Sequence, residues 1–179
     1  GQFVVTALAY SPSGDAMAVG TGDGQVMLYD AETYATIYTA DSGFEREVVT
    51  LAFNADGSRF AAGSLDQTAR VYDRETGESI QHMIGHEDPV QAVAFAPDGA
   101  ALLTCSGNAF AEDSDISLRL WDIASGQQLR QFGDEHMGEI NTFAFTPDGS
   151  SVISADGNSD ILRYDMLTLN ELVAFTEAN

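Results

Sequence analysis

Lysine is absent from this chain of 179 residues, and 7 arginines stand against 28 aspartates and glutamates, which gives a formal net charge of −21. Nucleic acids and anionic membranes are bound through basic surfaces that release counterions or meet negative charge. The composition therefore argues against both kinds of partner. No apolar run approaches the roughly 18 residues of a membrane-spanning helix, and no basic segment leads into an apolar one. We therefore expect a cytoplasmic protein.

Cysteine is nearly absent too, because Cys105 stands alone. No disulfide can form within the chain, and the redox compartment stays open. Hydrophobic residues make up 44% of the sequence, a proportion typical of a globular protein with a packed core. The excess of acid has three explanations that the sequence does not separate: a salt-rich habitat, a GC-rich genome, or attraction to a basic partner.

Two short motifs recur four times and set a period of 42 to 50 residues. The first is a turn ending in glycine, at Gly14, Gly57, Gly99 and Gly149. The second is an aromatic residue followed by aspartate, at Tyr29-Asp30, Tyr72-Asp73, Trp121-Asp122 and Tyr164-Asp165. The two motifs lie 16 residues apart in three units and 23 apart in the third. Unit three therefore contains a seven-residue insertion, within Gly107 to Ser114.

Each unit has the pattern of four short strands separated by turns. In unit three, apolar alternation and turn residues predict strands over Val90 to Phe95, Ala101 to Cys105, Ser117 to Trp121 and Gln128 to Phe132. One four-stranded antiparallel sheet per 40–45 residues is typical of a β-propeller blade. The prediction is an all-β protein over residues 1–179 with four blades, at about 3–44, 45–87, 88–137 and 138–177.

Unit three also resembles a known family. It contains Gly85-His86, the Pro97-Asp98-Gly99 turn and Leu118 to Asp122, and this combination is similar to a complete WD-repeat (tryptophan-aspartate repeat) motif. The resemblance implies a ring of blades that serves as a rigid platform for other proteins. Propellers of this family usually have more than four blades, and no strand is left over to join the first blade to the last. We therefore expect an open arc with one apolar face at each end, to be covered by further blades or a second copy.

His86, Thr104 and Asp115 invite two interpretations. As base, nucleophile and orienting acid they would form a hydrolytic triad. In the WD-repeat family, however, these positions together with Trp121 form a buried hydrogen-bond chain with a structural role, and the resemblance favours this second interpretation. Unit four is expected to keep part of the chain, as His136, Ser154, Asn158 and Tyr164. Units one and two have Val19 and Ala62 at the hydroxyl position, so we expect their chains to be broken and their loops to be held less firmly.

No cofactor or metal site is predicted. Gly20 to Gly24 has glycine spacing like that of a phosphate-binding loop, but a P-loop needs a lysine, which this sequence lacks. Asp156, Asn158 and Asp160 match the first half of an EF-hand loop, yet Ile161 replaces the required glycine. The three histidines are too scattered to indicate zinc.

The expected function is a non-catalytic scaffold that binds protein partners, because no cofactor motif or convincing catalytic cluster is present. The alternative is a regulatory or sensor segment of a larger multidomain enzyme, and a third hypothesis is a propeller hydrolase with its own site. The family fold places the loops between blades and the turns between second and third strands on one face. The predicted partner residues are those of this face: Asn108, Phe110, Glu112 and Asp113 in the insertion, Leu65 and Ser114 in the turns, and Glu47, Gln91 and Asn141 at the starts of first strands.

Overall fold

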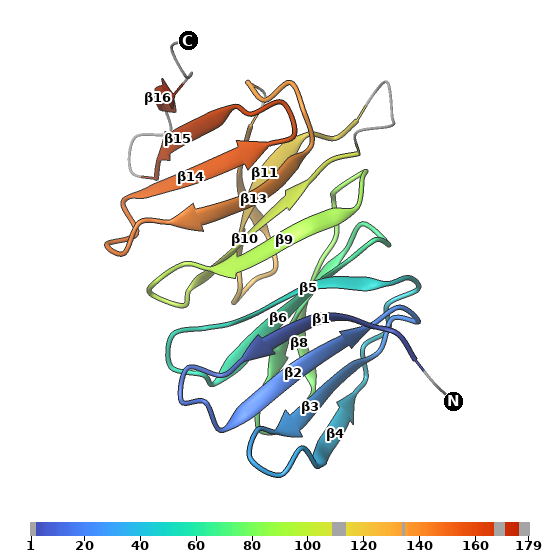
Figure 1. Ribbon diagram of the computed structural model, residues 1–179. Helices are drawn as coiled ribbons and strands as arrows, with labels where there is room; N and C mark the ends of the chain where they lie inside the picture. The colour runs from blue at the N-terminus through green and yellow to red at the C-terminus, as the bar shows by residue number, and fades with distance from the viewer. Residues whose placement is uncertain (1–2, 109–113, 134, 167–170, 176–179) are drawn as a thin grey trace.

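The computed structural model describes residues 3–108, 114–133, 135–166 and 171–175. Within these residues the chain forms sixteen strands in four antiparallel sheets of four strands each, which confirms the predicted all-β fold (Figure 1). Among the same residues, no helix has the length and apolar character needed to cross a membrane.

Each sheet is one blade, and its strands are ordered as in the sequence. Blade 1 contains β1 (Val5–Tyr10), β2 (Ala16–Thr21), β3 (Val26–Asp30) and β4 (Thr36–Ala40). Blade 2 contains β5 (Val48–Phe53), β6 (Arg59–Ser64), β7 (Ala69–Asp73) and β8 (Ser79–Met83). Blade 3 contains β9 (Val90–Phe95), β10 (Ala101–Ser106), β11 (Ser117–Asp122) and β12 (Gln128–Phe132). Blade 4 contains β13 (Ile140–Phe145), β14 (Ser151–Asp156), β15 (Ile161–Asp165) and β16 (Glu171–Phe175).

The repeated glycine turn joins the first strand of each blade to the second. Its glycine has a positive φ, between 69° and 72° in the four blades, a conformation that side chains with a Cβ rarely adopt. In every blade the glycine N–H donates to the carbonyl oxygen three residues earlier, that of Ser11, Asn54, Ala96 or Thr146. The sequence motif therefore encodes the same closed turn four times.

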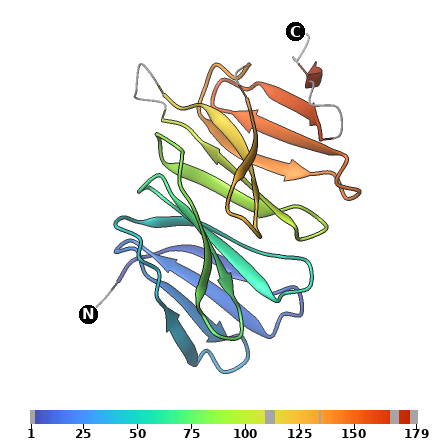
Figure 2. The same ribbon diagram turned by 180° about the vertical axis from the view of Figure 1, so that it is seen from behind.

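The blades follow one another in an open arc. Neighbouring blades contact through their first strands, β1 with β5, β5 with β9, and β9 with β13. Blades 1 and 4 lie at opposite ends of the molecule, as both views show (Figures 1 and 2). The described residues thus form an unclosed propeller.

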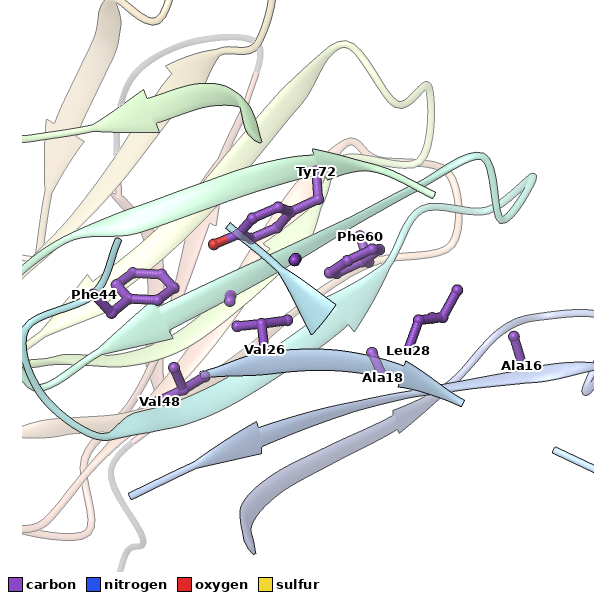
Figure 3. Packing of buried hydrophobic residues seen from close by; sticks show 10 residues of the cluster. Ala16, Ala18, Val26, Leu28, Phe44, Val48, Phe60 and Tyr72 are labelled. Atoms are coloured by element: carbon purple, nitrogen blue, oxygen red, sulfur yellow. The ribbon is translucent and has the colours of Figure 1, made fainter. Parts of the chain in front are cut away.

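Hydrophobic cores fill the seams between blades. Ala16, Ala18, Val26 and Leu28 of blade 1 pack against Val48, Phe60, Ala62 and Tyr72 of blade 2, and Figure 3 shows much of this cluster. Similar clusters lie between blades 2 and 3 and between blades 3 and 4. Because successive side chains of a strand point to opposite faces, the inner strands of blades 2 and 3 contribute to two seams each.

A polar contact crosses each seam at the outer strand. Tyr38 Oη donates to Arg74 O over 2.6 Å, Gln81 Nε2 donates to Ile123 O over 3.1 Å, and Arg130 Nη1 donates to Asp165 O over 2.9 Å. The three donors occupy the same position of β4, β8 and β12. Three different side chains therefore serve to fasten one blade to a carbonyl group of the next.

The end face of blade 1 is apolar. Met17, Val19 and Met27 cluster on the side of the sheet that points away from blade 2. Beside them on β1, Leu8 and Tyr10 are 52% and 53% exposed. This face agrees with the expectation of an apolar end.

The end face of blade 4 is mixed. Ile153 and Ile161 are exposed on it, but Arg163 occupies the position that Leu28, Val71 and Leu120 hold in the other blades. The guanidinium of Arg163 donates to Ser151 Oγ through Nε and Nη2. The expectation of an apolar face at this end is therefore only partly met.

Candidate functional site

The polar residues of unit three form one buried chain of hydrogen bonds. Trp121 Nε1 donates to Thr104 Oγ1 over 2.9 Å, and Thr104 Oγ1 lies 2.6 Å from His86 Nε2. His86 Nδ1 lies 3.1 Å from Asp115 Oδ2. With the indole as a fixed donor, the chain is satisfied when the Thr104 hydroxyl donates to Nε2 and Nδ1–H donates to the carboxylate. His86 is then neutral.

The electrostatics agree with a neutral histidine beside a charged carboxylate. Burial lowers the pKa of His86, and the positive charge of Arg119 adds to this effect. For Asp115, burial alone would raise the pKa, but hydrogen bonds from His86, the Glu87 N–H and other donors lower it well below its usual range. Arg119 Nη2 also reaches Asp115 Oδ2 over 3.1 Å. The carboxylate is therefore held as an anion by several donors.

The chain in blade 3 is closed to substrates. Thr104 has no exposed surface, the His86 side chain is 2% exposed and Trp121 is 3% exposed. A nucleophile has to reach a substrate carbonyl or phosphorus, and the Thr104 hydroxyl has no path to one in this arrangement. The geometry is that of a packed core element.

Blade 4 has a related chain, but the residue that bonds to the second imidazole nitrogen is not the predicted one. His136 Nε2 lies 2.6 Å from Ser154 Oγ, as expected, whereas His136 Nδ1 lies 3.1 Å from Asp156 Oδ2 rather than from Asn158. Asn158 contributes its backbone N–H to Asp156 Oδ1. The prediction of Asn158 was wrong, because Asp156 at the end of β14 already contacts the imidazole. The Tyr164 hydroxyl donates to Glu135 Oε2.

Blade 2 replaces the polar chain with apolar packing. Phe44 precedes β5 by four residues, as His86 precedes β9, and it stands where the histidine would be. Phe44, Ala62 and Tyr72 are all buried in the seam with blade 1. The broken chain of this unit was predicted from Ala62, but Phe44 was not predicted as the apolar substitute for the histidine. The signal was present in the constant spacing to the first strand.

Loops and turns of each blade meet at one end of the molecule. The residue that follows β2, β6 or β14 donates its N–H to the residue just before the first strand of the same blade: Gly22 to Val4 O, Leu65 to Glu47 O, and Gly157 to Glu139 O. Blade 3 uses a side chain instead, because Asp88 Oδ2 accepts from Ser114 Oγ and from the Asp115 N–H. These contacts define a face of the molecule, which we call the loop face.

Several predicted partner residues lie on the loop face and are already engaged there. Gln91 Nε2 donates to Gly107 O and to Glu139 Oε1, and Ser114 Oγ accepts from the Asn108 N–H over 2.7 Å. Glu47 and Leu65 are half-buried, and Asn141 is exposed. Phe110, Glu112 and Asp113 lie outside the described residues.

A hollow of about 380 Å³ opens on the loop face between blades 1 and 2. Phe3, Val4, Gly22, Asp23 and Glu47 line it, and Val4 is 71% exposed. Of the predicted partner residues, Glu47 belongs to this hollow. In the part of the chain that the structure describes, no group of three or more histidine, cysteine, aspartate or glutamate residues is arranged to hold a metal ion.

The fold and the repeated polar groups define a β-propeller assembled from WD-type repeats. The family model that matches residues 1–111 is described as the nucleolar protein 10-like N-terminal domain, a β-propeller. The chain belongs to this family of WD-repeat β-propellers.

Three relatives extend the comparison. The chain is 33% identical over 133 residues to the uncharacterized WD repeat-containing protein sll1491 of Synechocystis sp., a match that covers 74% of this chain and 36% of that protein. It is 39% identical over 54 residues to nuclear distribution protein PAC1 of Fusarium vanettenii, covering 30% of this chain and 12% of that protein. The match to PAC1 of Gibberella zeae is 40% identical over 50 residues, 27% of this chain and 11% of the relative. The chain thus corresponds to about a third or less of each relative.

Proposed function

We propose that this chain is a non-catalytic part of a protein-interaction scaffold and that a protein partner binds on its loop face. The observation that carries the proposal is that the second-to-third-strand turns are tied to the starts of the first strands. This arrangement presents side chains of successive blades on one rigid surface. WD-repeat propellers in general serve as platforms for protein partners, which supports the same conclusion.

Burial of the triad-like groups supports the non-catalytic part of the proposal. The Thr104 hydroxyl contacts the imidazole of His86 and accepts from the indole of Trp121, and the imidazole in turn contacts the carboxylate of Asp115. An unpaired polar group inside the seam would cost about 1–3 kcal/mol. The need to pair these buried polar groups is therefore enough to explain the hydrogen bonds without a catalytic role.

The partner site on the loop face is proposed to include the insertion of blade 3. Phe110 would be the anchor, and the neighbouring residues in the sequence, Asn108, Glu112 and Asp113, would belong to the same site. The other proposed contact residues on the loop face are Ser114, Leu65, Glu47, Gln91 and Asn141. Aromatic side chains are enriched among the residues that contribute most to binding at interfaces. The base of the insertion is fixed by the bonds from Ser114 to Asp88 and from the Asn108 N–H to Ser114.

Affinity capture with two matched variants tests this site. Phe110→Ala is expected to weaken the retained partner by more than about 1 kcal/mol, or roughly fivefold, without changing Trp121 fluorescence. Leu129→Ala removes a 59% exposed side chain on β12 of the same blade and should leave the capture unchanged. Equal retention by wild type and Phe110→Ala would place the partner on another surface.

Three further expectations stay predictions. A regulatory or sensor segment of a larger multidomain enzyme is the alternative function. Covering of the end faces by further blades or by a second copy would complete the ring. A cytoplasmic location is the third of these predictions.

A further inference from the structure

The residue that follows the marker aspartate occupies the same place in each blade. Its backbone N–H donates to the turn before the second strand: Arg74 to Ser58 O, Ile123 to Ala100 O, and Met166 to Ser150 O. In two seams the side chain at this place is apolar and fills the gap beside the outer strand. Ile123 is 5% exposed within the core between blades 2 and 3, and Met166 packs against the core between blades 3 and 4.

In the seam between blades 1 and 2, the residue at this place is not apolar. It is Arg74, whose Nη2 lies 2.7 Å from Asp15 Oδ2 on the first turn of blade 1. A cleft of about 490 Å³ opens in this seam. The side chains of Leu28, Ile37 and Tyr38 form its apolar wall, and Ile37 is 52% exposed.

The other wall of the cleft is acidic. Asp56, Asp73 and Glu75 line it, and the one cation among its lining residues is Arg74, which is paired with Asp15. Hydrogen bonds from Ser58 lower the pKa of Asp56, and those from Thr76 lower the pKa of Asp73. Both carboxylates are therefore charged at neutral pH. A ligand of this cleft has to combine an apolar side chain with positive charge.

We propose that the cleft between blades 1 and 2 binds a basic peptide segment of a partner protein, with one aliphatic side chain inserted between Ile37, Tyr38 and the turn at Ser58 and with an arginine or lysine on each side of it. The aliphatic side chain would take the place that Ile123 fills in the next seam. The flanking cations would meet Asp56, Asp73 and Glu75. The inference rests on the proposed scaffold function and adds to it a second surface.

The cleft and the loop face lie at opposite ends of the blades. The cleft is formed by the turn between β5 and β6 and by the turn between β7 and β8, whereas the loop face is formed by the turns between second and third strands. In an antiparallel meander these two sets of turns emerge at opposite ends. The two surfaces can therefore be tested separately.

The experiment is a titration of the isotopically labelled chain with three capped pentapeptides, followed by two-dimensional amide NMR spectra. The central three residues are Arg-Leu-Arg, Glu-Leu-Glu or Arg-Ser-Arg, with glycine at both ends. Arg-Leu-Arg should produce saturable shifts at the amides of Ile37, Tyr38, Ser58 and Arg74, with a dissociation constant at or below about 1 mM. The other two peptides should bind at least about fivefold more weakly, because one lacks the charge and the other the apolar group.

Variants of the seam sharpen the result. Arg74→Ile copies Ile123 and fills the cleft, so binding of Arg-Leu-Arg should fall at least about tenfold. Ala31→Ile is its matched control, because the Ala31 N–H makes the equivalent bond to Asp15 O in blade 1, away from the cleft; binding should be retained. Ile37→Ala removes an exposed wall residue and should weaken binding about threefold even if Arg74→Ile fails to fold.

The outcomes separate the two proposals. Absence of shifts at about 10 mM Arg-Leu-Arg, equal binding of Glu-Leu-Glu, or undiminished binding to both Arg74→Ile and Ile37→Ala would overturn the cleft proposal. Phe110→Ala should not affect the peptide titration. A failure confined to Phe110→Ala in partner capture would count against the loop face and leave the cleft intact.

Discussion

The buried polar residues of blade 3 depend on one another. Thr104 accepts from Trp121 and contacts His86, and His86 in turn contacts Asp115, so that removal of any one leaves a buried donor or acceptor unpaired. Blade 2 fills the equivalent positions with Phe44, Ala62 and Tyr72, of which only Tyr72 has a polar group, and its hydroxyl donates to Ser42 O. Equivalent positions are therefore filled in two ways, and in the polar one a single substitution also leaves a buried hydrogen-bonding group without a partner.

Asp115→Ala should destabilise the chain far more than Asp23→Ala. Asp115 accepts from His86, Glu87, Ser117 and Arg119, and its side chain is 9% exposed. Loss of a buried charge partner of this kind costs about 3–5 kcal/mol. Asp23 is exposed and accepts from Thr21 and Gln25, so we expect a loss below about 1 kcal/mol. Urea unfolding followed by far-UV circular dichroism measures both, and equal losses would remove the argument for a coupled network.

Stability should fall as the pH drops through the range in which free histidine titrates. The pKa of His86 is lowered in the folded chain, so the unfolded chain takes up a proton near pH 6.5 while the folded chain stays neutral to lower pH. The unfolded state then binds more protons, and the free energy of unfolding decreases by at most about 1.4 kcal/mol per pH unit for this residue.

Thermal unfolding between about pH 7.5 and 5.5 tests this linkage. His86→Gln should flatten the slope, because glutamine does not titrate. Burial also lowers the pKa of His82. The His82→Gln variant therefore measures how much of the slope comes from this second histidine. An unchanged slope in His86→Gln would show that the titration lies elsewhere.

At the scale of strands and turns, neighbouring blades are held together by the contacts in the seams between them. Each blade is fastened to the next by an outer-strand donor, and the seam between blades 3 and 4 also contains Cys105, whose Sγ lies 3.3 Å from Ile140 O. Cys105 has no exposed surface, and burial raises its pKa to about 12. The thiol can therefore react only when blade 4 separates from blade 3 or when the chain unfolds.

Thiol labelling should report opening of this seam alone. Ile140→Ala removes a fully buried side chain at the start of β13 and should speed the reaction of Cys105 with a disulfide reagent at least about tenfold. Val48→Ala makes the equivalent change at the start of β5, in the seam between blades 1 and 2, and should have much less effect. Equal acceleration by both variants would mean that the arc opens as a single cooperative unit.

The whole molecule combines an open arc with a large negative charge. Within the described residues, arginine–carboxylate ion pairs join Arg74 to Asp15 and Arg119 to Asp115. Even if each of the 7 arginines neutralised one of the 28 carboxylates, 21 would be left without a cation. Repulsion among them opposes the compact state.

Melting temperature should therefore rise with salt. Between low ionic strength and about 0.3 M NaCl the screening length shortens to under about 8 Å, and we expect an increase of roughly 5 °C. The measurement is a differential scanning fluorimetry series in NaCl and KCl, which should agree if screening is the cause. A flat or falling curve would mean that pairing or bound cations already neutralise the surface.

The four glycine turns, the sixteen strands and the order of blades could be predicted from the sequence. Each depends on local chemistry, namely a positive φ at glycine and apolar alternation with period two, and repetition made the pattern unambiguous. The resemblance to the WD-repeat family implied that His86, Thr104 and Trp121 lie together, and the structure brings them together. The acid of blade 4 could not be predicted, because Asp156 and Asn158 are both close enough in sequence and only the path of the turn decides between them.

Tertiary structure alone decided what lies between blades. The sequence alone establishes the repeat and the strand pattern, because both follow from spacing along one chain. It did not determine that Phe44 is buried in the core between blades 1 and 2, or that Arg74 turns toward Asp15 and leaves a cleft beside Tyr38. Arg74 and Asp15 are 59 positions apart in the sequence, and their contact is set by the packing of one sheet on the next.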